Sequence, residues 1–203
     1  PIKSSAASDV YKRQVYNWSA HARTEYRWWV ARLRHALNWF DALRLDHFRG
    51  FAAYYSVPAR AKNARDGCWL PGPGLSLFSA LQQALGDVPL LAEDLGFLTP
   101  SVLKLVADSG FPGMKVVEFA FDVRDTGAAS DYLPHNYDKN CVVYTGTHDN
   151  DTIQGWYQTL SEEDKEMTKE YLNNPYTPDE EVHWDFISLA MRSVADTCII
   201  PVQ

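Results

Sequence analysis

Three apolar stretches of the sequence each end abruptly in charged or polar side chains. The stretches read DALRLDHFRG, VPLLAEDLG and CVVYTGTHDNDT. Their polar ends supply Arg44, Asp46, His47, Glu93, Asp94, His148, Asp149 and Asn150. Parallel α/β sheets carry their chemistry at such places, where a buried strand leaves the core and opens into a loop. The sequence therefore predicts that Asp46, Glu93 and Asp149 meet at one rim of a sheet.

Carboxylates grouped in this way are typical of glycosidases and transglycosylases that retain the anomeric configuration. Such enzymes need one carboxylate as nucleophile and one carboxylic acid as proton donor, about 5–5.5 Å apart. Arg44 and Asp46 share one face of a strand, so the guanidinium is expected to hold Asp46 ionised, as a nucleophile requires. Glu93 follows an apolar run, which favours the protonated acid. Asp149, with His148, is expected to bind sugar hydroxyls and to stabilise an oxocarbenium-like transition state.

These residues also have structural interpretations. A carboxylate at the end of a strand is commonly a helix cap or a surface group, and Arg44 with Asp46 can be a simple ion pair. The HDND segment offers His148, Asp149 and Asp151 as metal ligands, but no second histidine cluster supports a metal site. We therefore predict no metal, and the case for catalysis depends on three similar sites rather than on any one of them.

Composition excludes several classes of function. With 203 residues, of which 46% are hydrophobic, the chain is long enough to bury one sizeable core. The net charge of −7 argues against a nucleic-acid surface, and no basic run suggests a membrane patch. We find no signal peptide and no apolar run of about 18 residues, so no membrane span is predicted. Cys68, Cys141 and Cys198 form no CxxC pair, which argues against zinc and favours a reducing compartment.

Strand-like and helix-like segments alternate along the chain. Apolar runs predict strands over 42–46, 88–92, 114–121, 141–145 and 197–203. Helices separate most of them, and a polar loop fills 122–140. Such alternation implies a parallel sheet with right-handed crossovers. Because neither GxGxxG nor a phosphate-binding loop occurs, we predict part of a (β/α)8 barrel rather than a nucleotide-binding fold.

Helix signals are clear between these strands. Apolar spacing predicts one helix over 19–40, capped by Ser19, and another that Gly86 stops. Thr99 and Pro100 show the cap and first-position pattern of a third. Further caps are predicted at Asp151, at Ser161 with Asp164, and at Thr177 with Glu180.

The segment 51–75 is rich in Gly and Pro and is predicted to be a long irregular loop. Loops of this length in compact domains are often functional. Trp69 lies just before the PGPG turn of this segment. Two interpretations stay open for its side chain: a rigid platform that stacks on a sugar ring, or a buried anchor of the loop.

The two ends of the chain differ from the rest. Residues 1–14, PIKSSAASDVYKRQ, lack periodicity and resemble translated adapter sequence; a natural flexible terminus is the alternative interpretation. We expect residues 15–203 to form the folded part. Because the chain stops inside its last predicted strand, we expect the sequence to be truncated.

Four segments resemble a known family. LRLDHFRGF, WLPGPG, LLAEDLG and HNYDKNCVVYTGTHDNDT are similar to motifs of the 4-alpha-glucanotransferases of glycoside hydrolase family 77, and the resemblance covers about residues 15–203. It implies that Asp46 is the nucleophile, Glu93 the general acid/base and Asp149 the transition-state-stabilising aspartate. It further implies contacts with sugar or carboxylate groups. The residues concerned are Arg44 and His148, with His47, Asp94, Asn150 and Trp69 as further substrate-binding candidates.

The resemblance implies a barrel enzyme without a cofactor, which transfers α-1,4-glucan segments between malto-oligosaccharides. The chain would hold about strands four to eight, so we expect it to be inactive without the first half of the barrel. Asp138 and Ile153 stand where Pro and Thr are commoner, with little expected effect. The alternatives are a retaining hydrolase of the alpha-amylase type and a non-catalytic glucan-binding fragment. The expected location is the bacterial cytoplasm, with a plastid as the alternative.

Overall fold

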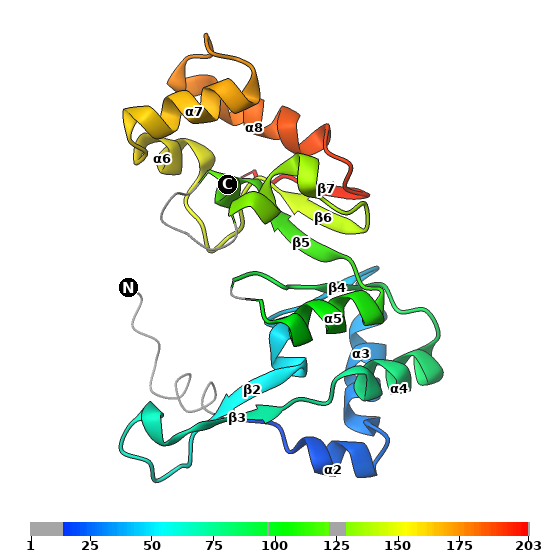
Figure 1. Cartoon of the computed structure of the whole chain (residues 1–203). Helices are drawn as coiled ribbons and strands as arrows, with labels where there is room; N and C mark the ends of the chain where they lie inside the picture. Colours follow the sequence, from blue (N-terminus) through cyan, green and yellow to red (C-terminus); the bar gives the residue numbers. More distant parts are fainter. Residues whose placement is uncertain (1–13, 97, 122–128, 203) are drawn as a thin grey trace. The chain divides into compact units, whose positions relative to one another are not determined.

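The computed structural model describes residues 14–96, 98–121 and 129–202, and it divides into two compact units (Figure 1). The first unit comprises the described residues up to Leu43, together with 48–89 and 100–109. The second unit comprises 44–47, 90–99 and the described residues from Gly110 onward. Apart from Gln14, the predicted leader lies outside the described residues. Both units combine helices with strands, which confirms the α/β class.

The first unit packs helices around an aromatic core. Its elements are α2 (Trp18–Arg23), α3 (Arg27–Leu37), the 3-10 turns η1 (Phe48–Phe51) and η2 (Ala64–Asp66), β2 (Ala53–Ser56), β3 (Cys68–Pro71), α4 (Leu75–Leu85) and α5 (Pro100–Ser109). Phe48 stacks on Phe78, and both side chains are buried. The predicted stops and starts at Gly86 and Pro100 are confirmed, since α4 ends just before Gly86 and α5 begins at Pro100.

The single helix predicted over 19–40 is wrong, because α2 and α3 are separate helices. Between them Glu25 and Tyr26 have left-handed backbones, with φ of 50° and 55°. The amide of Tyr26 donates to the carbonyl of His21, which closes the end of α2. Tyr26 is buried and its hydroxyl lies 2.6 Å from Oγ of Ser76, so a side-chain contact fixes the break. Asn17, rather than Ser19, caps α2.

The segment 51–75 is also more regular than predicted. β2 and β3 pair as an antiparallel hairpin, with Tyr55 opposite Trp69. The chain after β3 passes close to the backbone of η1, and a Cβ at Gly72 would lie 2.2 Å from the carbonyl oxygen of Phe51. Only glycine fits this approach, which explains one glycine of the PGPG turn.

Among its described residues, the second unit carries five short strands. They are β1 (Leu43–Leu45), β4 (Leu90–Ala92), β5 (Gly113–Val116), β6 (Cys141–Tyr144) and β7 (Thr197–Ile199). Of β1, only Arg44 and Leu45 belong to this unit. β1 pairs with β4, and β5, β6 and β7 form a parallel sheet in that order (Figure 1). The amide of Ala92 donates to the carbonyl of Pro112 and links β4 to β5. The strand predicted over 114–121 is shorter than expected, because 3-10 turn η3 (Val117–Ala120) replaces its second half.

Both faces of this sheet are apolar, as a buried parallel sheet requires. On one face Val143 packs with Trp156 and Phe186, which come from α6 (Ile153–Gln158) and α8 (Val182–Met191). On the other face Val142 packs with Met114, and partly buried Leu91 lies against them. Val142 and Val143 point to opposite faces of β6, so this strand packs against an apolar cluster on each side.

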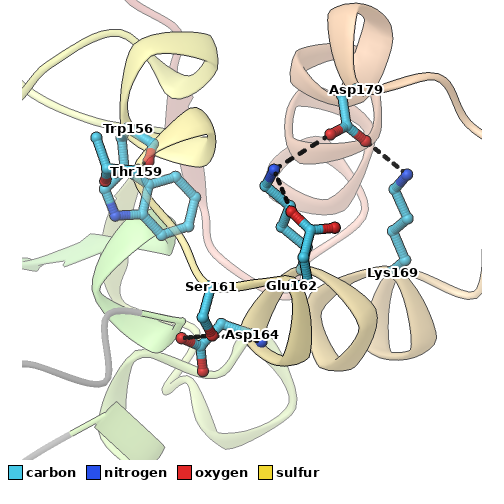
Figure 2. A network of polar contacts seen from close by, with 8 residues as sticks. Trp156, Thr159, Ser161, Glu162, Asp164, Lys169 and Asp179 are labelled. Carbon is cyan, nitrogen blue, oxygen red and sulfur yellow. Dashed lines mark hydrogen bonds and ion pairs between the residues drawn. The ribbon is translucent and has the colours of Figure 1, made fainter.

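The helix caps predicted from the sequence are confirmed only in part. Ser161 caps α7 (Glu162–Leu172) and bonds Asp164 in both directions, as predicted (Figure 2). Thr152, rather than Asp151, caps α6. The capping box predicted at Thr177 is wrong. There the chain enters a 3-10 turn, η6 (Asp179–Glu181), and α8 begins without a side-chain cap.

The predicted polar loop contains two more 3-10 turns, η4 (Ala129–Tyr132) and η5 (Pro134–Asn136), while residues 122–128 lie outside the described part. Within the described ranges, every helix falls short of the length and apolarity that crossing a bilayer demands.

Candidate functional site

Asp46 and Glu93 come from the carboxyl ends of the paired strands β1 and β4. Arg44 and Asp46 lie on one face, and Nη2 of Arg44 is 3.2 Å from Oδ1 of Asp46, as their spacing predicts. The Asp46 side chain is 77% exposed, so it is accessible to a ligand. The ion pair places the Arg44 guanidinium beside this carboxylate.

The Glu93 carboxylate is held by main-chain amides. The N–H of His47 donates to Oε2 at 2.6 Å, and the N–H of Leu95 donates to Oε1 at 3.1 Å. The sequence predicts an apolar setting for this residue, and Ala92 before it is indeed fully buried. The carboxylate itself nevertheless meets polar donors, because the left-handed backbone of His47 brings its amide to the strand end.

Asp94 points away from Glu93. Its Oδ1 accepts the N–H of Met114 at 2.7 Å, and a Cβ at Gly113 would lie 2.5 Å from its Oδ2. Burial raises the pKa of Asp94, while the Met114 amide and Lys115 act in the opposite direction. The structure thus gives this predicted substrate-binding residue a contact that fastens β4 to β5.

His148 and Asp149 lie together in the loop after β6. Nε2 of His148 is 3.4 Å from Oδ2 of Asp149, and both side chains are largely exposed. The amide oxygen of Asn150 accepts both the N–H and the hydroxyl of Thr147, at 2.9 and 2.7 Å. Asn150 therefore shapes the turn that presents His148 and Asp149.

Asp151 serves the start of α6. Its Oδ1 accepts the N–H of Thr152 at 2.7 Å. Across the described ranges, no group of three or more His, Cys, Asp and Glu side chains is arranged to hold a metal ion.

Trp69 belongs to the first unit, on the β2–β3 hairpin. Its side chain is 56% exposed, so the interpretation as a buried loop anchor is wrong. The Arg49 guanidinium lies 5.1 Å from the ring centroid, and the Tyr55 ring meets it edge-on at 5.5 Å. These contacts fix the orientation of the indole, which a stacking platform requires.

Sequence reasoning missed a buried carboxylate at the end of β5. Glu118 is 4% exposed, and its amide donates to the carbonyl of Thr145 at 3.2 Å. A Cβ at Gly146 would lie 3.2 Å from its Oε2, so Glu118 lies against the segment that leads to His148. The available signal was a single acidic residue inside the apolar run MKVVEFAF.

Sequence reasoning also missed a cavity beside the end of β6. It has a volume of about 430 Å³, and Thr147, Gln154, His183 and Trp184 are among its lining residues. His183 Nδ1 lies 3.1 Å from Nε2 of Gln154, and Trp184 is 63% exposed. Hydroxyl, amide, imidazole and indole groups are the kinds that contact sugars. The four residues lie apart in the sequence, so the sequence alone does not reveal that they line one cavity.

Comparison with known proteins points to one family. The sequence profile of glycoside hydrolase family 77, described as 4-alpha-glucanotransferase, matches residues 11–203. A 4-alpha-glucanotransferase of Clostridium butyricum is 44% identical over the whole chain, and the match covers 41% of that protein. A chloroplastic or amyloplastic 4-alpha-glucanotransferase of Arabidopsis thaliana is also 44% identical, with 34% of its length covered.

A solved structure shows the same fold. The amylomaltase of Streptococcus agalactiae, in complex with acarbose, superposes with a TM-score of 0.82 and 37% identity over 93% of this chain. This chain covers 37% of that protein, so it spans about two fifths or less of the relatives it matches. On the profile match, the chain belongs to glycoside hydrolase family 77, the 4-alpha-glucanotransferase family.

Proposed function

We propose that this chain is the catalytic second part of a 4-alpha-glucanotransferase, which moves α-1,4-glucan segments between malto-oligosaccharides by double displacement. The observation that carries the proposal is the hydrogen bond from His47 to Glu93, which brings the carboxylate of β4 to the residue beside Asp46. Two carboxylates at adjacent strand ends suit a retaining mechanism.

In this mechanism Asp46 attacks the anomeric carbon, and Glu93 protonates the departing 4-oxygen of the donor glucan. Glu93 then accepts a proton from the 4-hydroxyl of the acceptor glucan, whose oxygen displaces Asp46. Arg44 is the ion-pair partner of Asp46, and Asp149 with His148 binds the reacting sugar. Trp69 supplies a surface on which a further sugar ring stacks. No cofactor enters this scheme.

The strand order supports a partial barrel. β1 pairs with β4, one main-chain hydrogen bond joins Ala92 of β4 to Pro112 just before β5, and β5, β6 and β7 are parallel in that order. This succession in sequence order suits consecutive strands of a (β/α)8 barrel. We infer that they are about the fourth to eighth strands, and that the first half of the barrel is their natural partner. The three free cysteines fit a reducing compartment such as the bacterial cytoplasm.

The proposed activity is tested by incubating maltotriose with the longer polypeptide that, by this proposal, contains residues 15–203. Transfer gives both longer and shorter glucans, whereas glucose and maltose alone would indicate a hydrolase. Asp46→Asn is expected to lower kcat by about 10⁴-fold or more while glucan affinity is kept, because the amide cannot form the covalent glycosyl ester. Retained turnover in this variant would exclude Asp46 as the nucleophile.

A further inference from the structure

His47 has an unusual backbone for its position. Four described residues other than glycine are left-handed, and three of them break or end helices: Glu25, Tyr26 and Asn173. His47 follows β1 directly and precedes η1, with φ of 51°. A left-handed backbone is sterically unfavourable for an L-residue and persists only where its surroundings hold it.

The surroundings of His47 are two hydrogen bonds to the same residue of β4. The N–H of Glu93 donates to the carbonyl of Leu45 at 3.0 Å, just before Asp46. The N–H of His47 donates to Oε2 of Glu93 at 2.6 Å, just after Asp46. Glu93 thus holds the chain on both sides of Asp46, and the second bond needs the left-handed backbone of His47.

These bonds reach both oxygens of the Glu93 carboxylate. With the amide of Leu95 on Oε1 and the amide of His47 on Oε2, each carboxylate oxygen accepts an N–H. A short N–H bond to a charged oxygen is stronger than one to a neutral group. The amide of His47 therefore fixes the position of the Glu93 carboxylate.

We propose that His47 is a positioning residue that acts through its main-chain N–H rather than through its imidazole. This proposal rests on the proposed function, in which Asp46 is the nucleophile. When Asp46 bonds to the anomeric carbon, the bond from that carbon to the 4-oxygen breaks. Its electron pair goes to that oxygen, which takes the proton of Glu93. The His47 amide then stabilises ionised Glu93 until the acceptor hydroxyl returns a proton and its oxygen displaces Asp46.

A pair of substitutions separates the main-chain role from a side-chain role. Glycine accepts a φ of 51° and keeps the N–H, whereas the branched side chain of valine opposes this backbone. We expect His47→Val to lower kcat/KM by about tenfold or more, the effect of losing a hydrogen bond to a charged group. We expect His47→Gly to lower it much less.

The split between kcat and KM gives a readout that a merely structural role would not move. Because a misplaced Glu93 slows proton transfer, the loss in His47→Val should lie in kcat rather than in KM, and His47→Gly should keep most of kcat. Asn173→Val is the matched control, because Asn173 has φ of 54° at the end of α7. It should lose stability without a change in kcat.

A measurement on the unsubstituted protein keeps the proposal testable if His47→Val does not fold. The amide proton of His47 should resonate far downfield because of its short bond to Glu93, and Glu93→Gln should move it upfield. An amide that ignores Glu93, or equal losses in the glycine and valine variants, would overturn the role of the main chain. Absence of transfer in the unsubstituted enzyme would instead overturn the proposed function.

Discussion

Asp94 and Glu93 are adjacent carboxylates with different partners. Substitutions at Asp94 should show that its side chain stabilises the fold. Asp94→Asn keeps an oxygen for the Met114 amide, whereas Asp94→Ala leaves that amide without its acceptor, at a cost of roughly 1–3 kcal/mol of unfolding free energy.

Because burial raises the pKa of Asp94 above 3.8, its contribution favours the fold at low pH and is lost as pH rises through the raised value. Asp94→Asn should therefore gain stability relative to wild type between pH 4 and pH 7. Urea midpoints at both pH values measure this, and a constant difference would contradict it.

The same pair of residues shows what could be predicted at this scale. The assignment of Asp46 and Glu93 as catalytic residues stays a prediction. The spacing of Arg44 and Asp46 predicted their contact, which the ion pair confirms. Glu93 and Asp94 follow β4 and have different partners, since Glu93 accepts the amides of His47 and Leu95 and Asp94 accepts the amide of Met114. The contact with Met114 depends on a residue 20 positions away in sequence, which spacing alone does not reveal.

At the scale of elements, one charged network joins α7 to η6. Asp179 accepts a hydrogen bond from Lys169 at 2.7 Å and lies 3.5 Å from Lys165, which also contacts Glu162 (Figure 2). The hydrogen bond from Lys169 lowers the pKa of Asp179. This contribution to stability is present above about pH 4 and is lost as pH falls through the lowered value. Asp179→Asn should cost roughly 0.5 kcal/mol at pH 7, since the carboxylate is 41% exposed and solvent screens the pair.

Urea unfolding tests the network when it is measured at pH 7 and below pH 3. Each measurement is made with and without about 1 M salt, which screens surface charge. The loss should vanish at low pH and shrink in salt. Asp108→Asn is a suitable control, because Asp108 pairs only along its own helix with Lys104 in α5. An equal loss in both variants would mean that joining two elements adds nothing.

Elements were predictable where their signals are local. Ser161 and Asp164 cap α7 through contacts within one turn, and sequence reading found them. The break after α2 was missed because apolar spacing continues through Tyr26, whose burial and bond to Ser76 are tertiary. The β2–β3 hairpin was missed because every residue of β3 is exposed, which removes the alternation that marks a strand.

At the scale of the whole molecule, the strand series has two open ends. Among the described residues, β1 has only β4 as a hydrogen-bonded strand neighbour, and β7 has only β6. Large apolar side chains are also exposed, including Trp39 at 75% and Met191 at 68%. Open strand edges and exposed apolar groups are interaction surfaces in a complete barrel and aggregation sites in a partial one.

We therefore expect the 203-residue chain alone to be marginally stable or aggregating and to leave maltotriose unchanged, while the longer polypeptide is monodisperse and active. Size-exclusion chromatography with light scattering, run beside the maltotriose assay, measures both properties. Supplying the proposed first half of the barrel as a separate polypeptide is the informative control. If the open edges of β1 and β7 are its docking sites, the added half should reduce aggregation and restore some transfer, and Asp46→Asn in this chain should abolish what is restored. A soluble, monomeric chain that unfolds cooperatively and transfers glucans by itself would show that the second unit forms a complete site without closing its sheet.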